Sequence, residues 1–309
     1  MSPPAAETLT AFGLDLDGVP VAILGGRGLC YRVGNALLKP CDDIAESQWV
    51  SEISTTLLNL SPTAYRLPIP LPTISDVINF TFDGWSASSF LPGAPAPKRF
   101  LDLFVASRAL HDDLAVIVKE KPLAVQNRAF NRFDEADRVT WGEKTLDEAQ
   151  KVDQEMLAQL QPILDQLGRA WRPLPFLPCQ VIHMDLLGNA LFQDGSPPGI
   201  IDLTFYWRPA LYAEAVVVAD ALAWVVKGEE RQGLVDSYLE GGESGKDSGG
   251  TGDIRVQLLV RALYWRYVTF AIDPDRTWVR ANLPQADYAG AAKVVCDLVV
   301  GPALAQNAG

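Results

Sequence analysis

Residues 182–189 read Ile-His-Met-Asp-Leu-Leu-Gly-Asn, and residues 199–202 read Gly-Ile-Ile-Asp. These two runs place a histidine, two aspartates and an asparagine close together, and the apolar residues around them predict short strands. Loops between strands hold polar side chains on a rigid frame, and carboxylate and amide oxygens are the ligands that magnesium prefers. The pattern therefore predicts a base beside a metal site, which is the set of groups that phosphoryl transfer from ATP requires.

A structural interpretation of the same residues is a series of turns. Asp and Asn beside Gly often form turns, as residues 194–198, Asp-Gly-Ser-Pro-Pro, are expected to do. The chain contains two histidines, His111 and His183, and the second lies two residues before Asp185. Because a match in several parts carries more weight than a single motif, we favour a functional site over a coincidence.

The four polar residues resemble the catalytic motifs of the aminoglycoside phosphotransferase and choline kinase-like superfamily, whose members have a protein-kinase-like fold. By this resemblance Asp185 is the catalytic base, His183 supports the catalytic loop, and Asn189 and Asp202 bind Mg²⁺. The family usually has four residues between the aspartate and the asparagine, whereas this chain has three. It is therefore similar to an uncharacterised branch with a shortened loop, in which we expect Gly188 to supply an unusual backbone angle.

A glycine-rich hairpin near the N-terminus predicts a site for the phosphates of ATP. Residues 21–24 and 29–33 predict two strands, and the loop between them contains Gly25, Gly26 and Gly28. Glycine lets main-chain N–H groups approach phosphate oxygens, because no Cβ is in the way. Such a hairpin alone is more often a simple turn, but a strand-borne lysine and the catalytic loop follow it here in the order that kinase-like chains have.

The next strand carries the lysine that this family uses against the α- and β-phosphates. Residues 36–40 predict the strand, and Lys39 lies at its end. The segment 42–60 predicts a helix with one apolar stripe. Glu46 and Glu52 on this helix are the candidates for the carboxylate that holds the lysine ammonium, and either is also compatible with a surface position. We prefer Glu52 because it adjoins the apolar stripe.

A second hairpin predicts the connector to which adenine binds. Residues 77–82 and 85–91 alternate apolar and polar side chains around a two-residue turn. The resemblance places the end of the second strand at the connector, and it therefore puts Ser89, Phe90 and Leu91 near the base.

The composition of the chain changes after residue 97, from short glycine-punctuated segments to helical ones. Helices are predicted at 99–118, 145–166, 209–226, 229–240, 253–271 and 285–300. Together with the resemblance, this order predicts an α+β, two-lobed protein-kinase-like fold. The N-lobe, residues 1–91, is expected to be a small antiparallel β-sheet with one helix that binds nucleotide. The C-lobe, residues 92–309, is expected to be mainly helical and to carry the catalytic loop and the substrate site.

The acceptor site is expected beside the second aspartate. Tyr206, Trp207 and Arg208 follow it closely, and they suit a planar or apolar acceptor, with the arginine available for a carboxylate or phosphate. An equally strong interpretation is that the three residues pack this segment on the helix that begins near residue 209.

The composition of the chain limits the classes of binding partner and the cellular compartment that we expect. The formal net charge is −12, which disfavours nucleic acid and anionic membranes as partners. The apolar run 212–226 contains two acids and is shorter than the roughly 20 residues that span a bilayer. The four cysteines have no paired spacing and no secretory leader precedes them, so we expect reduced thiols, a cytoplasmic location and neither zinc nor a disulfide framework.

The expected activity is an ATP- and Mg²⁺-dependent transfer of the γ-phosphoryl group to a hydroxyl of a small molecule. One alternative is a pseudokinase, which senses nucleotide or binds a protein and has lost catalysis through the shortened loop. Another keeps the site but transfers a nucleotidyl group. The presence of the lysine, both aspartates and the asparagine favours the kinase.

Overall fold

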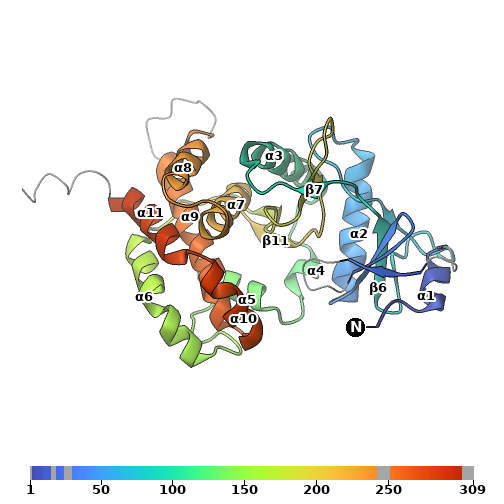
Figure 1. Cartoon of the computed structure of the whole chain (residues 1–309), viewed down its shortest axis with the longest axis horizontal. Helices are drawn as coiled ribbons and strands as arrows, with labels where there is room; N and C mark the ends of the chain where they lie inside the picture. Colours follow the sequence, from blue (N-terminus) through green and yellow to red (C-terminus); the bar gives the residue numbers. More distant parts are fainter. Residues whose placement is uncertain (1, 15–18, 24–29, 242–250, 301–309) are drawn as a thin grey trace, which may run out of the picture. The chain divides into compact units, whose positions relative to one another are not determined.

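The computed structural model of the chain describes residues 2–14, 19–23, 30–241 and 251–300 (Figure 1). The predicted phosphate-loop residues Gly25, Gly26 and Gly28 lie outside these described residues. The chain divides into two compact units. Unit 1 consists of residues 1–129 and 180–207, and unit 2 consists of residues 130–179 and 208–309. This division groups residues by contact and does not test the predicted lobe boundary at residue 91.

The main sheet of unit 1 is antiparallel and has the order β1-β2-β3-β6-β4, with β5 paired to β6. Its strands are β1 (Val21–Ala22), β2 (Tyr31–Val33), β3 (Ala36–Pro40), β4 (Pro70–Leu71), β5 (Thr81–Phe82) and β6 (Trp85–Ser89). Both hairpin turns use left-handed residues, with φ +58° at Gly34 and φ +47° and +74° at Asp83 and Gly84. The angles at Asp83 and Gly84 confirm the two-residue turn that the sequence predicts there.

Alternation along β3 decides where Lys39 points. The neighbouring Leu38 is fully buried in a core with α1 (Ala6–Ala11) and with β2 and β6. The members of this core are Leu9, Phe12, Val33, Leu38, Trp85 and Ala87. Because successive side chains of a strand point to opposite faces, Lys39 lies on the face away from this core.

Helix α2 (Ile44–Asn59) begins at Asp43, whose carboxylate accepts a hydrogen bond from Glu46 N at 3.0 Å. The side chain of Gln48 then ties the helix to the turn that precedes β5. It donates to Ile78 O at 2.7 Å and accepts from Phe80 N at 2.8 Å. These bonds fix which face of α2 is directed toward the turn.

The predicted strand 77–82 is wrong except at β5. Asp76 accepts a hydrogen bond from Ile78 N, and Asn79 accepts one from Thr81 N, both at 3.1 Å. Short side chains that bond their own backbone in this way stabilise a turn in place of a strand.

The remaining strands of unit 1 form two small sheets. One has the order β10-β9-β7, and the other pairs β11 with β8. The strands are β7 (Ala94–Pro95), β8 (Gln180–His183), β9 (Ala190–Phe192), β10 (Gly199–Ile200) and β11 (Phe205–Arg208). Helix α3 (Phe100–Ile117) packs on β8, and the short α4 (Leu123–Gln126) packs on α2.

Unit 2 is helical, and α9 lies at its centre, in contact with α5, α6, α7 and α11 (Figure 1). Its α-helices are α5 (Arg132–Thr140), α6 (Gln154–Ala170), α7 (Ala210–Trp224), α8 (Glu230–Glu240), α9 (Thr251–Val268), α10 (Arg276–Asn282) and α11 (Tyr288–Val300). Residues 212–223 of α7 are all buried, as expected for a core helix. The sequence did not predict α1, α4, α5 or α10.

The start of α6 corrects the predicted helix 145–166. Glu148 accepts hydrogen bonds from the N–H and hydroxyl of Thr145, and Lys151 has φ +54°. Asp153 then caps the helix by accepting from Met156 N at 3.0 Å. Local side-chain bonds therefore hold residues 145–153 in turns, and the helix begins only after the cap.

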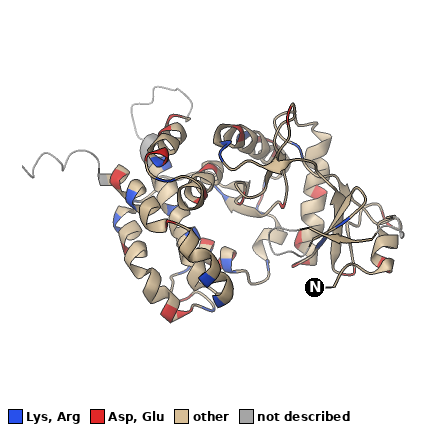
Figure 2. Cartoon of the chain, in the orientation of Figure 1, with Lys and Arg blue, Asp and Glu red and all other residues tan. Residues whose placement is uncertain are grey.

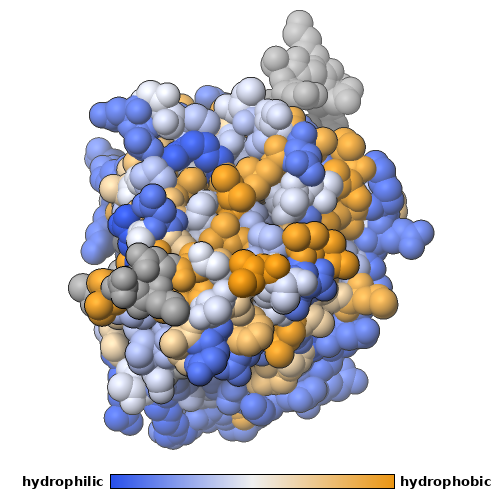
Figure 3. Space-filling view, turned by 90° about the vertical axis from the view of Figure 1, so that its right-hand side faces the viewer, coloured by the Kyte–Doolittle hydropathy of each residue, from blue (hydrophilic) through white to orange (hydrophobic). Residues whose placement is uncertain are grey.

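Within the described part of the chain, the helices are too short or too polar to cross a bilayer. Charged residues of both signs are interspersed along the helices in the view of Figure 2. The face drawn in Figure 3 carries patches of hydrophobic residues among polar ones.

Candidate active site

The predicted catalytic residues lie at or near the ends of three short strands in unit 1. His183 ends β8, Asn189 directly precedes β9, and Asp202 follows β10 by two residues. Strands β9 and β10 are antiparallel, and Ile201 N donates to Asn189 O at 2.9 Å. This pairing brings the backbone of the asparagine next to that of the second aspartate, and both lie beside the loop that carries Asp185.

The shortened loop closes through the asparagine. Asn189 N donates to Leu186 O at 3.1 Å, and Asn189 Nδ2 donates to Asp185 O and to Asp185 Oδ2, each at 2.8 Å. The amide nitrogen therefore faces Asp185, and the amide oxygen faces away from it. Gly188 does not have a positive φ, so the expectation that it supplies an unusual angle is wrong.

The unusual angle belongs to Asp202, which has φ +52°. This left-handed conformation is uncommon for a residue with a Cβ but is tolerated by aspartate. The Asp202 carboxylate forms an ion pair with Lys39 Nζ, from a residue 163 positions away in the sequence. Desolvation opposes the charge on the lysine, but the neighbouring carboxylate outweighs it and raises the pKa of Lys39.

The carboxylate bonded to Lys39 is thus not a glutamate of α2. Glu46 accepts two hydrogen bonds from Arg128, and Glu52 accepts one from Gln48 at 2.7 Å. The predicted pairing of Lys39 with Glu52 is therefore wrong for this structure. The reason is the orientation of α2, whose Gln48 directs this side of the helix toward the turn before β5.

Both histidines are buried and hold the backbone of the catalytic segment. His111 Nε2 accepts a hydrogen bond from His183 N at 3.0 Å, and His111 Nδ1 lies 3.2 Å from Ser107 Oγ. Burial, with a smaller repulsion from His183, lowers the pKa of His111 from 6.5 to about 3, so the ring is neutral and can accept. His183 Nδ1 in turn accepts from Thr204 N at 3.1 Å, which ties the catalytic strand to the segment after the second aspartate.

The predicted adenine contacts differ in what their main chains bind. Ser89 N donates to Ile69 O at 2.8 Å, and Phe90 N donates to Asn35 O at 2.6 Å. Leu91 lies beyond the strand, and its main chain takes no part in the hydrogen bonds that the structure describes. Of the three, Leu91 is therefore the residue whose N–H and C=O these bonds leave for a ligand.

The predicted acceptor residues are mostly buried. Tyr206 is 3% exposed, and Trp207 is partly buried. The Arg208 guanidinium forms ion pairs with Asp137 at 2.6 Å and Glu143 at 2.7 Å. Burial disfavours this charge, but the two carboxylates outweigh that effect and raise the pKa of Arg208. Arg208 is thus a packing residue, and the structural interpretation of this segment fits better than an acceptor pocket.

The donors at the site suit a hard cation. A group of three His, Cys, Asp or Glu side chains that could hold a metal is absent from the described residues. The Asp202 carboxylate and the Asn189 amide oxygen are nevertheless oxygen donors of the kind that magnesium binds. Magnesium commonly uses one or two carboxylates and completes its shell with water and substrate phosphates. The residues present therefore fit Mg²⁺ bound together with a nucleotide.

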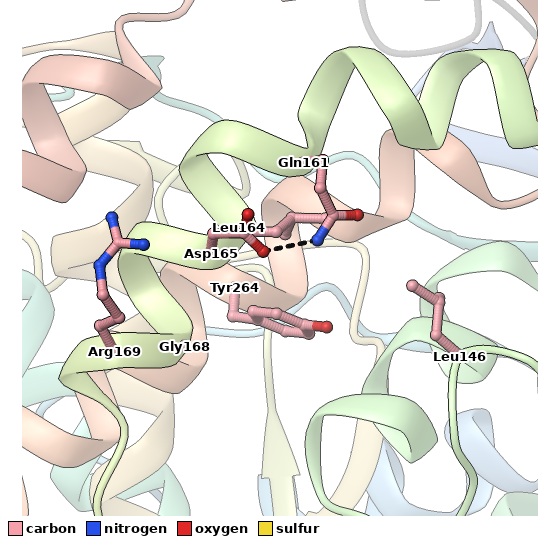
Figure 4. A pocket seen from close by; sticks show the side chains of 7 residues that line it. All are labelled: Leu146, Gln161, Leu164, Asp165, Gly168, Arg169 and Tyr264. Atoms are coloured by element: carbon pink, nitrogen blue, oxygen red, sulfur yellow. Dashed lines mark hydrogen bonds between the residues drawn. The ribbon is translucent and has the colours of Figure 1, made fainter.

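Two cavities are lined by residues other than these. A cavity of about 410 Å³ in unit 2 is lined by Leu146, Gln161, Leu164, Asp165, Gly168, Arg169 and Tyr264 (Figure 4). Gln161 Nε2 donates to Asp165 Oδ1 at 2.7 Å along its wall. A groove of about 460 Å³ in unit 1 is lined by Thr55, Leu58, Asn59, Ile69, Pro70, Pro72, Val77 and Phe80. Neither contains a predicted site residue.

Solved structures identify the fold. The microcompartment-associated aminopropanol kinase matches with a TM-score of 0.60 and 14% identity, over 96% of each chain. A spectinomycin phosphotransferase in complex with ADP and spectinomycin matches with a TM-score of 0.53 and 15% identity, also over 96% of each chain. An aminoglycoside phosphotransferase from Alicyclobacillus acidocaldarius matches with a TM-score of 0.54 and 13% identity, over 99% of this chain and 96% of that one.

No model of a known protein family matches the sequence, and a search of curated proteins finds no match. The likeness to solved structures therefore concerns the fold. The chain has the α+β, protein-kinase-like fold of aminoglycoside phosphotransferases and related small-molecule kinases. The predicted fold class and the resemblance are confirmed at this level.

Proposed function

We propose that this protein is a phosphotransferase that moves the γ-phosphoryl group of ATP to a hydroxyl of a small molecule, with Mg²⁺ as cofactor. One observation carries the proposal. Lys39 and Asp202, 163 residues apart, bond to each other, and Asn189 and Asp185 bond to each other one strand away. Four residues of the types that phosphoryl transfer requires thus lie in one unit.

Each residue has a role that follows from its chemistry. Asp185 orients the acceptor hydroxyl and takes its proton as the acceptor oxygen bonds to phosphorus and ADP leaves. Lys39 binds the phosphates of the nucleotide, and the main chain at Leu91 binds adenine. Asp202 and Asn189 would hold Mg²⁺, which would neutralise the charge that develops on the phosphates.

The ion pair between Lys39 and Asp202 is of a kind that charged ligands can replace. Both side chains are almost half exposed, at 44% and 45%, so their attraction is weakened by water. In a complex with magnesium and ATP, Lys39 would bond a phosphate and Asp202 would hold the metal. Two charge-assisted contacts thus replace one.

Isothermal titration with a non-hydrolysable ATP analogue, with and without Mg²⁺, tests the nucleotide site. We expect magnesium to strengthen binding in the wild type, and Asp202→Asn to remove that gain. Asparagine is the better substitution than alanine, because it also tolerates the positive φ at this position. Binding that is indifferent to magnesium in both proteins would contradict the metal site.

Asp185→Ala tests the chemistry. A general base contributes roughly 10²- to 10⁴-fold to the rate, so we expect turnover to fall by that factor while nucleotide affinity persists. The acceptor is found first by incubating the wild type and ATP with hydroxylated small molecules and measuring product masses. A gain of one phosphoryl group marks a kinase, whereas a gain of a nucleotidyl group marks the alternative transfer. Full turnover in the variant would remove Asp185 from the mechanism.

The pseudokinase is the second candidate, and the contact between Asp185 and Asn189 favours it. An amide nitrogen at 2.8 Å occupies one oxygen of the proposed base. A pseudokinase would bind the analogue and would give no phosphorylated product with any acceptor. The four cysteines have no paired spacing, and on that ground we also propose a reducing, cytoplasmic location.

A further inference from the structure

Helix α2 is joined to the segment after Asp202 by one arginine. Arg128 Nε and Nη2 donate to the two carboxylate oxygens of Glu46, at 3.0 and 2.5 Å. The same Nη2 also donates to Phe205 O at 2.6 Å. The Arg128 side chain is 5% exposed and that of Glu46 is 20% exposed, so the three groups meet largely out of water.

The acceptor of this third bond lies close to the candidate site. Phe205 is three residues after Asp202, and its ring is in edge contact with Trp49 of α2 and with His183 of the catalytic strand, at 5.5 and 6.4 Å between ring centres. Thr204, directly before it, donates to His183 Nδ1. A change in the position of Phe205 therefore moves both the residue that precedes it and the packing of the catalytic strand.

The hydrogen bonds of Arg128 to Glu46 and to Phe205 O are called the bridge below. They connect α2 to the catalytic segment, whereas the glutamates of α2 do not bond to Lys39. In the described structure the lysine bonds Asp202, Glu52 bonds Gln48, and Glu46 bonds Arg128. The charged tie between α2 and the catalytic segment thus passes through Arg128.

We propose that Arg128 is a positioning residue, which sets the backbone after Asp202 through its hydrogen bond to Phe205 O and is itself held by Glu46. This inference rests on the proposed function, since it assigns a residue to the same site. The planar guanidinium makes all three bonds at once, two to a carboxylate in its fork geometry and one to a carbonyl. Lysine has a single ammonium and does not reproduce that geometry.

The test compares Arg128→Lys with the wild type over a series of magnesium concentrations. We expect the magnesium concentration that gives half-maximal nucleotide affinity to rise about tenfold, the effect of losing roughly one net hydrogen bond to a positioned group. Glu46→Gln keeps a side-chain acceptor for Arg128 and leaves the bond to Phe205 O, so we expect a smaller rise. Affinity for the nucleotide without magnesium is expected to stay near the wild-type value in both.

Arg266→Lys is the matched control. Arg266 makes the same two-point contact with Asp220 in unit 2, at 2.9 and 2.7 Å, and both side chains are 12% exposed. Its guanidinium lies over the Trp265 ring at 4.3 Å, as that of Arg128 lies over Tyr206 at 5.0 Å. We expect this variant to lower the melting temperature about as much as Arg128→Lys and to leave the magnesium dependence unchanged. Equal magnesium dependence in the two variants would overturn the inference.

Hydrogen exchange separates this inference from the proposed function. We expect Arg128→Lys to speed amide exchange in the first turn of α2 and in residues 203–206 together, and Arg266→Lys to leave both segments unchanged. If the wild type binds no magnesium-nucleotide, the proposed function fails, and coupled exchange still supports the bridge. Exchange that changes in neither segment, or in only one, overturns the bridge whatever the nucleotide result.

Discussion

Two ion pairs in this molecule use similar groups in opposite surroundings. In unit 1 the side chains of Lys39 and Asp202 are 44% and 45% exposed. In unit 2 those of Arg208 and Asp137 are 9% and 4% exposed, and a second carboxylate, Glu143, bonds the same guanidinium. Asp202 also has φ +52°, whereas φ is not positive at Arg208, Asp137 or Glu143.

The difference separates pairs that can exchange partners from pairs that hold the fold. An exposed pair contributes at most about 1 kcal/mol, so a ligand of the right charge can replace it. Removal of one partner from a buried pair leaves an uncompensated charge and costs roughly 3–5 kcal/mol. Exposure therefore marks Lys39 and Asp202 as a pair whose partners a charged ligand can replace.

The largest effect is expected for Arg208→Leu. This change leaves Asp137 and Glu143 without their cation, and we expect the free energy of unfolding to fall by about 3–5 kcal/mol. Urea unfolding followed by circular dichroism measures it. Lys293→Leu removes a fully exposed partner of Asp297 and is expected to have no measurable effect. A small loss in Arg208→Leu would mean that burial does not distinguish the two kinds of pair.

Lys39→Met tests the exposed ion pair of this comparison. We expect nucleotide affinity to fall about 10- to 100-fold with or without Mg²⁺, because a charge-assisted hydrogen bond to phosphate is worth roughly 1.5–3 kcal/mol. The free energy of unfolding is expected to change by less than about 1 kcal/mol. Calorimetry and urea unfolding on the same sample measure both. A loss of stability as large as that in Arg208→Leu would show that the pair belongs to the core.

His111 gives a dependence on pH. Its pKa is about 3 in the folded protein and 6.5 when unfolded, so between these values the unfolded chain binds one proton more. Stability attributable to this residue is therefore complete above pH 6.5 and is lost as the pH falls, by about 1.4 kcal/mol per pH unit.

His111→Gln removes this titration. The difference in unfolding free energy between wild type and variant, measured from pH 7 to pH 4.5, is expected to shift steadily in favour of the variant as the solution becomes more acidic. Taking the difference cancels the contribution of the carboxylates that both proteins share. A difference that does not vary with pH would mean that His111 is not held neutral.

The sequence predicted the fold class through the family resemblance, and it singled out the main residues of the candidate site because the motifs of that resemblance are short local patterns. Lys39 alternates with a buried leucine on a strand, and Asp185, Asn189 and Asp202 end or follow short apolar runs. Such patterns determine where a side chain leaves a strand, and the antiparallel pairing of β9 with β10 then brings the strand ends together.

The sequence could not predict what depends on distant contacts. The apolar stripe of α2 gives its buried face but not which glutamate meets the lysine, since the orientation of the helix depends on the bonds of Gln48 to a turn 30 residues away. In the sequence, Arg128 follows the four-residue helix α4 by two positions, and it belongs to no motif. The buried ion pairs of Arg208 could not be predicted either, because its partners Asp137 and Glu143 lie about 70 residues earlier in the sequence.

Gly199 at the start of β10 and Gly188 in the shortened loop differ in the space around them. A Cβ on Gly199 would lie 2.6 Å from Leu91 Cδ2 and 3.3 Å from Arg66 Nη2, both side-chain atoms. Gly199→Ala is therefore expected to lower the free energy of unfolding by about 1–3 kcal/mol, because the neighbouring side chains must shift. Thermal unfolding measures the change.

Gly188→Ala is the counterpart in the shortened loop. A Cβ there has no atom within 4 Å, and its φ is not positive. We expect stability to change by less than about 0.5 kcal/mol and the magnesium dependence of nucleotide binding to stay the same. The loop is closed by Asn189, which bonds back to Leu186 and Asp185, and it therefore does not depend on glycine. Weaker magnesium-nucleotide binding in Gly188→Ala would mean that Gly188 has a positive φ in the nucleotide complex. The hydrogen bonds between Asn189 and Asp185 would then be absent from that complex.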